Sequence, residues 1–247
     1  MTRPRVTPAI PELFLGLLSI ALAAVWVAQM FANTIHDARH ARDTMTITGS
    51  ARVPITSNLV RWSLSVRGNA ATPQEAARIM TRDMKAVEAF LRAGGVPRGE
   101  MAETVVESET IVTRISKKKT RTTYRVSQGL DVSTRKIDLV EGVSTRLAEL
   151  IERGIDVVAD PLEYISTDLA NAKLDALQAA TEEARRRADI LVRGLGGKLG
   201  PMRSSSLGVY QITPRDSTDV SNYGINDTTS RDKDVTAVVS ATFAVKQ

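Results

Sequence analysis

The stretch DLANAKLDALQAATEEARRRADILVRGL, residues 168–195, decides the fold because it carries the clearest apolar periodicity in the chain. Its apolar side chains recur at steps of three and four residues, which places them on one face of an α-helix. This predicted packing face consists of Leu174, Leu177, Ala180, Ala184, Ala188, Leu191 and Leu195. Another face carries acid-then-base pairs four residues apart, Glu182 with Arg186 and Glu183 with Arg187, which is typical of a solvated surface. The helix is therefore predicted to cover a core with one side.

The glycine-rich segment GLGGKLG, residues 194–200, follows this helix and is predicted to end it. It is not a phosphate-binding loop, because such a loop opens a helix and needs Ser or Thr after its lysine. Here the segment follows a helix, and Leu199 follows Lys198. No Gly-x-Ser-x-Gly nucleophile elbow occurs in the sequence. A Ser–Lys dyad assembled by the fold stays open, but no pair of residues is singled out for it.

Composition limits the classes of function. The chain has 247 residues, 43% of them hydrophobic, which is enough for a real core. Cysteine is absent, which excludes disulfides, thiolate nucleophiles and cysteine-ligated metal or iron–sulfur sites. The net charge of +5 comes from Lys and Arg that are scattered among acids. We therefore expect no nucleic-acid partner.

Residues 13–32, LFLGLLSIALAAVWVAQMFA, form an apolar run of about twenty residues, which matches the thickness of a bilayer at helical rise. A cleaved signal peptide is the alternative, but its apolar region would be about 7–15 residues long and would end at a small-x-small site. We predict an uncleaved transmembrane signal anchor. Arg3 and Arg5 favour a cytoplasmic tail at residues 1–12, which makes the protein single-pass with everything after Asn33 outside the cytoplasm.

Residues 33–43 are predicted to be a juxtamembrane linker, and they contain the two histidines of the chain. His36 and His40 are four residues apart, a spacing that suits zinc on one helical turn. However, Asp37 stands where the metalloprotease pattern needs Glu, and no third ligand is indicated. We predict a solvated linker and no metal site.

Residues 44–247 are predicted to form one domain of α+β class, with antiparallel β-sheets covered by about three amphipathic helices and preceded by the one N-terminal transmembrane helix. Alternation of apolar and polar residues predicts most of the strands. Thr72 as the cap, Pro73 and Glu75 mark the start of the first of the three helices. The expected strands are 45–55, 59–70, 102–115, 120–134, 155–166, 198–212 and 235–245; the other expected helix is 136–153, and 213–232 is expected to be a mobile loop.

The turn between the third and fourth predicted strands is basic, with Lys117, Lys118, Lys119 and Arg121. One interpretation is structural, because lysines at a hairpin tip resist edge-to-edge pairing. The other is that these four residues contact an anionic surface, either lipid headgroups or an acidic envelope polymer. The sequence leaves both open.

The order of these blocks resembles the SIMPL-domain family of bacterial envelope proteins, which includes periplasmic immunogenic and stress-associated members. The resemblance covers residues 44–245 and lies in the order and spacing of blocks. The blocks are ITGSARVPI, LRAGGVPRGEM, TYRVSQGLDVSTRKIDLVEGVSTRLAELIERGID, EEARRRADILVRGLGGKLG and VTAVVSATFAV. The resemblance implies an α+β fold, extracytoplasmic placement, homo-oligomerisation and no established reaction or cofactor. It supplies no catalytic residues to carry over.

The leading functional hypothesis is a non-catalytic envelope protein, anchored in the lipid bilayer through residues 13–32, whose domain assembles with itself in envelope integrity or stress protection. The alternative is a binding module for a small or polymeric anionic envelope ligand or for a partner protein, acting through the lysine tip and the loop 213–232. An unrecognised hydrolase is a third reading that no residue supports.

Overall fold

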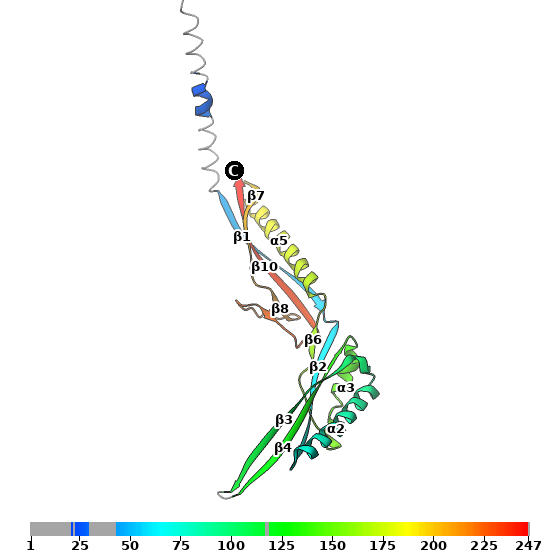
Figure 1. Cartoon of the computed structure of the whole chain (residues 1–247). Coiled ribbons are helices and arrows are strands. Elements are labelled where there is room, and N and C mark those ends of the chain that lie inside the picture. The colour runs from blue at the N-terminus through cyan, green and yellow to red at the C-terminus, as the bar shows by residue number, and fades with distance from the viewer. Residues whose placement is uncertain (1–20, 22, 30–42, 117–118, 247) are drawn as a thin grey trace, which may run out of the picture. The chain divides into compact units, whose positions relative to one another are not determined.

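A computed structural model describes residues 21, 23–29, 43–116 and 119–246 (Figure 1). Residues 21 and 23–29 of the predicted anchor are helical, whereas the rest of the anchor, the tail 1–12 and the two histidines lie outside the described residues. No helix in the described part of the chain is both long and apolar enough to cross a membrane.

The chain divides into two compact units. The large unit comprises Ser50–Ala180 and Gly208–Val238, and the small unit comprises Met1–Gly49, Thr181–Leu207 and Val239–Gln247. In chain order the elements are β1 Thr44–Thr56, β2 Leu59–Ala70, α2 Pro73–Ala93, η1 Arg98–Glu100, β3 Met101–Ser116, β4 Lys119–Thr134, α3 Ile137–Ser144, α4 Ala148–Glu152, β5 Asp156–Ala159, β6 Glu163–Ile165, α5 Leu169–Gly194, β7 Lys198–Leu207, β8 Gln211–Pro214, β9 Ile225–Asn226 and β10 Asp232–Lys246. The predicted α+β class with antiparallel sheets is confirmed.

The core of the large unit lies between α2 and an antiparallel sheet with strand order β3-β4-β2-β5, in which β6 also pairs with β2. Alternate side chains of β2 are almost fully buried, because one face of the strand meets the core: Val60, Trp62, Leu64 and Val66. Gly68 lets α2 approach β2 closely, since a Cβ at this position would lie 2.0 Å from the carbonyl oxygen of Ala76. The tight fit between strand and helix therefore depends on one missing side chain.

Helix α2 begins as the sequence predicts. The Thr72 hydroxyl accepts a hydrogen bond from the backbone N–H of Glu75 at 3.4 Å, and Pro73 occupies the first turn. The helix ends at Gly94, and Gly95 has a φ of 94°, which favours glycine.

The predicted helix 136–153 is wrong in one respect, because the structure divides it into α3 and α4. Side-chain hydroxyls bond back to helix carbonyls just before the break: Ser144 to Glu141 at 2.8 Å and Thr145 to Gly142 at 2.9 Å. Such bonds compete with helical hydrogen bonding. The backbone then tightens into i-to-i+3 bonds, for example from Leu147 N–H to the Ser144 carbonyl at 3.2 Å.

The second sheet has strand order β1-β10-β8-β9, and β7 also pairs with β10. The prediction that the strand near 235–245 returns into an existing sheet is confirmed, because β10 pairs antiparallel with both β7 and β8. The predicted strand 198–212 is two strands, β7 and β8. The predicted loop contains β9, which pairs parallel with β8.

Helix α5 is confirmed, but its predicted packing face is partly wrong. The buried side chains are small and recur every four residues: Ala172, Ala176, Ala180, Ala184, Ala188 and Val192. Leu174, Leu191 and Leu195 are instead 62%, 48% and 83% exposed. In the small unit, Ala184 and Ala188 pack with Ala241 and Phe243 of β10. We attribute the burial of alanines in place of leucines to the short distance between α5 and β10, because methyl groups let a helix lie closer to a sheet than leucine side chains do.

Candidate functional site

The β3–β4 hairpin is a highly exposed part of the large unit. Each strand has 16 residues, and β3 lies at the edge of its sheet, so only one of its two edges is paired (Figure 1). Nearly every residue of β3 is exposed, including large apolar ones: Val105 at 83%, Val106 at 49%, Val112 at 63% and Ile115 at 49%. The hairpin thus presents apolar side chains along an open strand edge.

The hairpin tip carries the basic residues that the sequence singled out. Lys119 and Arg121 are exposed on β4, whereas Lys117 and Lys118 lie outside the described residues. Arg121 lies opposite Thr113 and Arg114 opposite Thr120. Within residues 43–116 and 119–246, no ion pair involves Arg114, Lys119 or Arg121. Further down the hairpin, by contrast, Arg125 pairs with Glu109 at 3.3 Å.

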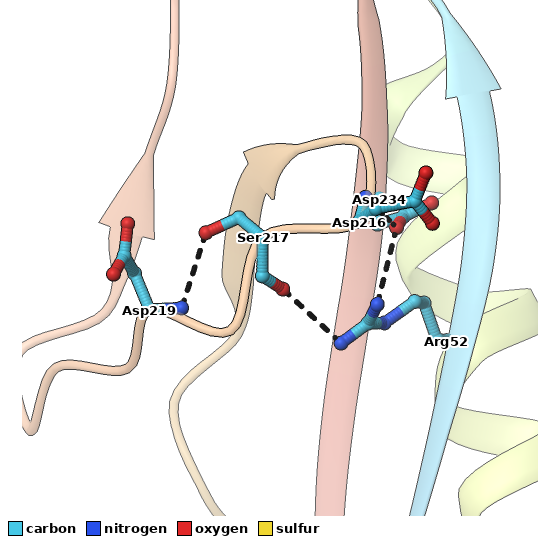
Figure 2. Close-up of polar contacts among 5 residues, drawn as sticks. All are labelled: Arg52, Asp216, Ser217, Asp219 and Asp234. Atoms are coloured by element: carbon cyan, nitrogen blue, oxygen red, sulfur yellow. Dashed lines mark hydrogen bonds and ion pairs between the residues drawn. The ribbon is translucent and has the colours of Figure 1, made fainter.

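A polar network that no sequence pattern indicates fixes the segment after β8. Asp234 is 3% exposed, and its Oδ2 accepts from the backbone N–H of Asp216 at 3.1 Å (Figure 2). Arg52 on β1 donates to the same oxygen at 3.5 Å and to the carbonyl of Ser217 at 3.3 Å. One oxygen of the buried carboxylate thus joins the Asp216 backbone to Arg52 on β1, which indicates a structural role.

Lys233 is a second buried charged group, 3% exposed, beside a cavity of about 360 Å³. Its ammonium donates to the carbonyl oxygens of Tyr164, at 2.7 Å, and Asp227. Burial lowers the pKa of Lys233, while the nearby Asp227 carboxylate opposes that shift. A perturbed lysine beside a cavity is typical of functional sites. Here both acceptors are backbone carbonyls, so the ammonium joins β6 to the segment after β9.

Tyr164 and Asp227 also have shifted pKa values. Burial and a 2.8 Å hydrogen bond from the Tyr164 hydroxyl to Glu141 raise the pKa of Tyr164 to about 12. Burial alone would raise the pKa of Asp227, but hydrogen bonds from Thr229 and Ser230, together with the charge of Lys233, lower it.

The described residues contain no group of three or more His, Cys, Asp and Glu side chains that could hold a metal ion. The His36 and His40 pair lies outside the described residues.

Comparison with known proteins gives the family and little else. No curated protein matches the chain. Among solved structures, the chain is similar to a hydantoinase/carbamoylase family amidase from Burkholderia ambifaria, with 17% sequence identity and a TM-score of 0.24. That match covers 51% of this chain and 34% of the amidase, and the likeness is too slight to carry any argument. The SIMPL family, described as protein of unknown function (DUF541), matches residues 45–243. The chain therefore belongs to the SIMPL family.

Proposed function

We propose that this SIMPL protein is a non-catalytic component of the bacterial cell envelope. Residues 13–32 anchor it in the inner membrane with the N-terminus cytoplasmic, and its periplasmic part assembles with further copies of itself in envelope integrity or stress protection. The observation that carries the assembly is the exposed β3–β4 hairpin.

The open edge of β3 is a surface suited to pairing. An edge strand presents unpaired N–H and C=O groups, and proteins that stay monomeric usually shorten, cover or charge such edges. Two of the three acids of β3 are engaged, Glu103 with Arg98 at 2.9 Å and Glu109 with Arg125. Val105 and Val106, between these two acids in the sequence, are exposed, and so is Val112, which follows them. A second copy that covers this strand would bury these side chains and pair the edge.

The small unit supports a position close to the membrane. Asp43 directly precedes β1, and its carbonyl accepts from the N–H of Val245 at 2.8 Å. At the same end of this sheet, Lys198 and Lys246 are directly opposite each other in β7 and β10. Like charges in this position repel, and anionic headgroups would offset the repulsion. The linker 33–43 spans at most roughly 40 Å when extended, so it keeps this end near the predicted anchor.

A non-catalytic role is supported by the partners of the buried charged groups. Lys233 and Asp234 are the buried charges most suited to chemistry, and both hold backbone segments in place. Among the described residues, neither Lys233 nor Asp234 forms a hydrogen-bonded pair of a nucleophile and a base.

The assembly is tested on the full-length protein in a neutral detergent, by native mass spectrometry and chemical cross-linking. We expect the wild type to be a multimer and the Val106→Lys/Val112→Lys variant to be a monomer. Val220→Lys serves as the matched control, because Val220 is 82% exposed and lies in the segment after β8. A strictly monomeric wild type, or a multimer that survives both hairpin substitutions, contradicts the assembly.

A second candidate function is the capture of an anionic envelope surface by Lys117, Lys118, Lys119 and Arg121. The observation in its favour is that the described members of this group have no acidic partner of their own. Reversing the charge of all four residues should abolish binding to acidic lipid or polymer. Unchanged binding would contradict this candidate while leaving the assembly untouched.

A further inference from the structure

The start of α3 opens into a cavity of about 590 Å³ within the large unit. Three segments that are distant in sequence meet there: the β1–β2 turn at Ser57, the start of α3 with Arg135 and Lys136, and Arg231 just before β10. The cavity is separate from the hairpin tip and from the cavity beside Lys233.

The first turn of α3 has free backbone donors. The N–H groups of Ile137, Asp138 and Leu139 have no acceptor in the described part of the chain, and the first backbone bond of this helix is from Val140 to Lys136 at 3.2 Å. The N-cap position is Lys136, and no side chain caps the helix there. Helix α2, by comparison, has Thr72 in that position. Free N–H groups at a helix N-terminus favour an anion.

The charge around this terminus is positive. Arg135 and Lys136 are exposed, and neither forms an ion pair with any residue that the structure describes. Arg231 is already neutralised, because its guanidinium pairs with Asp138 and lies 3.7 Å from Glu141. Asp138 is therefore occupied with Arg231, and two positive charges remain for a ligand.

An independent observation comes from Ser57. This residue is 3% exposed, and its hydroxyl is buried with no hydrogen-bond partner. Its backbone N–H donates to the carbonyl of Arg231 at 2.8 Å, which fixes the residue against the cavity that it lines. Buried hydroxyls are nearly always hydrogen-bonded, so an unpaired one at a cavity wall indicates a missing partner.

We propose that this cavity binds a phosphate group, with the N–H groups of α3, Arg135, Lys136 and the Ser57 hydroxyl as donors. A phosphate offers several acceptor oxygens to donors that converge from different directions, whereas a carboxylate offers two. Arginine matches the paired oxygens of phosphate, and lysine acts as a point charge beside it. The phosphate belongs either to a small soluble ester or to a lipid headgroup. The proposal does not depend on the assembly or on the membrane anchor.

The test is isothermal titration calorimetry of the full-length protein in neutral detergent with inorganic phosphate, against chloride at equal ionic strength. We expect Arg135→Ser and Lys136→Ser each to weaken phosphate binding about tenfold, because each removes a charge-assisted hydrogen bond. Arg153→Ser is the matched control: Arg153 is also an exposed arginine, paired with Glu149 at 3.8 Å and outside the cavity. This variant should bind phosphate as the wild type does.

Ser57→Ala separates a binding role from a purely structural one. Because the Ser57 hydroxyl has no partner, its removal should leave the melting temperature unchanged or raise it. The same substitution should weaken phosphate binding. A second titration, with mixed micelles that contain phosphatidylglycerol, identifies the source: a headgroup site binds these micelles more tightly than inorganic phosphate and loses that preference in Arg135→Ser. Absence of binding to both probes, or equal affinity in the wild type and the Arg135→Ser/Lys136→Ser variant, overturns the proposal.

Discussion

The backbone N–H of Asp216 donates to the buried carboxylate of Asp234 at 3.1 Å, and Asp216 is the one non-glycine residue in the described chain with a positive φ, 63°. Aspartate tolerates this left-handed conformation better than most residues. The carboxylate of Asp234 therefore stabilises a turn whose backbone is otherwise unfavourable.

Replacing Asp234 with alanine should destabilise the large unit by about 1–3 kcal/mol, because the Asp216 N–H would lose its acceptor and the Arg52 guanidinium one of its two. Urea denaturation followed by the fluorescence of the buried Trp62 measures the change. Asp219→Ala is the control, since Asp219 is exposed and contributes only its backbone N–H to this region. Equal effects of the two substitutions would show that the Asp234 carboxylate does not hold the turn.

The alanine row of α5 makes a prediction for the small unit. Ala188→Leu should cost about 1–3 kcal/mol, because the added atoms have no space between α5 and β10. Leu191→Ala should change stability by less than about 0.5 kcal/mol, since Leu191 is 48% exposed. Hydrogen exchange of the α5 amides measures both changes. The reverse order of effects would restore the packing face that the leucine periodicity predicts.

Two glycine-to-alanine substitutions should have opposite effects. Gly68→Ala places a Cβ 2.0 Å from the Ala76 carbonyl oxygen and 2.7 Å from the Met80 nitrogen, both backbone atoms, so α2 must move away from β2. Gly142→Ala meets nothing within 4 Å and lies inside α3, where alanine is favoured by about 1 kcal/mol. Thermal denaturation should therefore show a lower melting temperature for the first and a higher one for the second. A tolerated Gly68→Ala would disprove the close contact of α2 with β2.

Tyr164 makes a prediction about pH. Its pKa is about 12 in the folded protein, above the ordinary value of 10.0, because of burial and the hydrogen bond to Glu141. The folded state therefore keeps this proton longer than the unfolded state does. Protonated Tyr164 therefore stabilises the folded state below pH 10, and this stabilisation is lost as the pH rises towards 12.

Absorbance at 295 nm during an alkaline titration tests this pKa, since the chain has four tyrosines. We expect one of them to ionise late, and Tyr164→Phe to remove that late step. Tyr223→Phe is the control, because Tyr223 is 97% exposed. A late step that persists in Tyr164→Phe would assign it to another residue.

Strands and helix ends that depend on neighbouring residues were predictable from the sequence. The alternation in β2 and the Thr72 cap are local patterns, and both appear in the structure as expected. The buried face of α5 was not predictable, because leucines and alanines both recur at helical spacing and only the closeness of β10 favours alanine. The break after α3 depends on hydroxyl bonds of Ser144 and Thr145, which the apolar periodicity does not register.

The polar sites were beyond sequence analysis because their members are far apart in the chain. Arg52 and Asp234 are separated by 182 positions, and Lys233 and Tyr164 by 69. Nothing near Lys233 in the sequence distinguishes it from a solvated lysine at the start of a strand. The basic hairpin tip was recognisable because its residues are consecutive.

The pairing of β1 with β10 has a consequence for the order of folding during synthesis. The hydroxyls of Thr46 and Thr242 lie 2.8 Å apart but 196 positions apart in sequence. Helix α5 is rich in alanine, the strongest helix former, so we expect it to form locally as soon as it leaves the ribosome. The second sheet has to wait for β10, which pairs with β7 and is the last strand described. Until then, β1 and the alanine face of α5 remain uncovered, and this interval is when a nascent chain would need a chaperone.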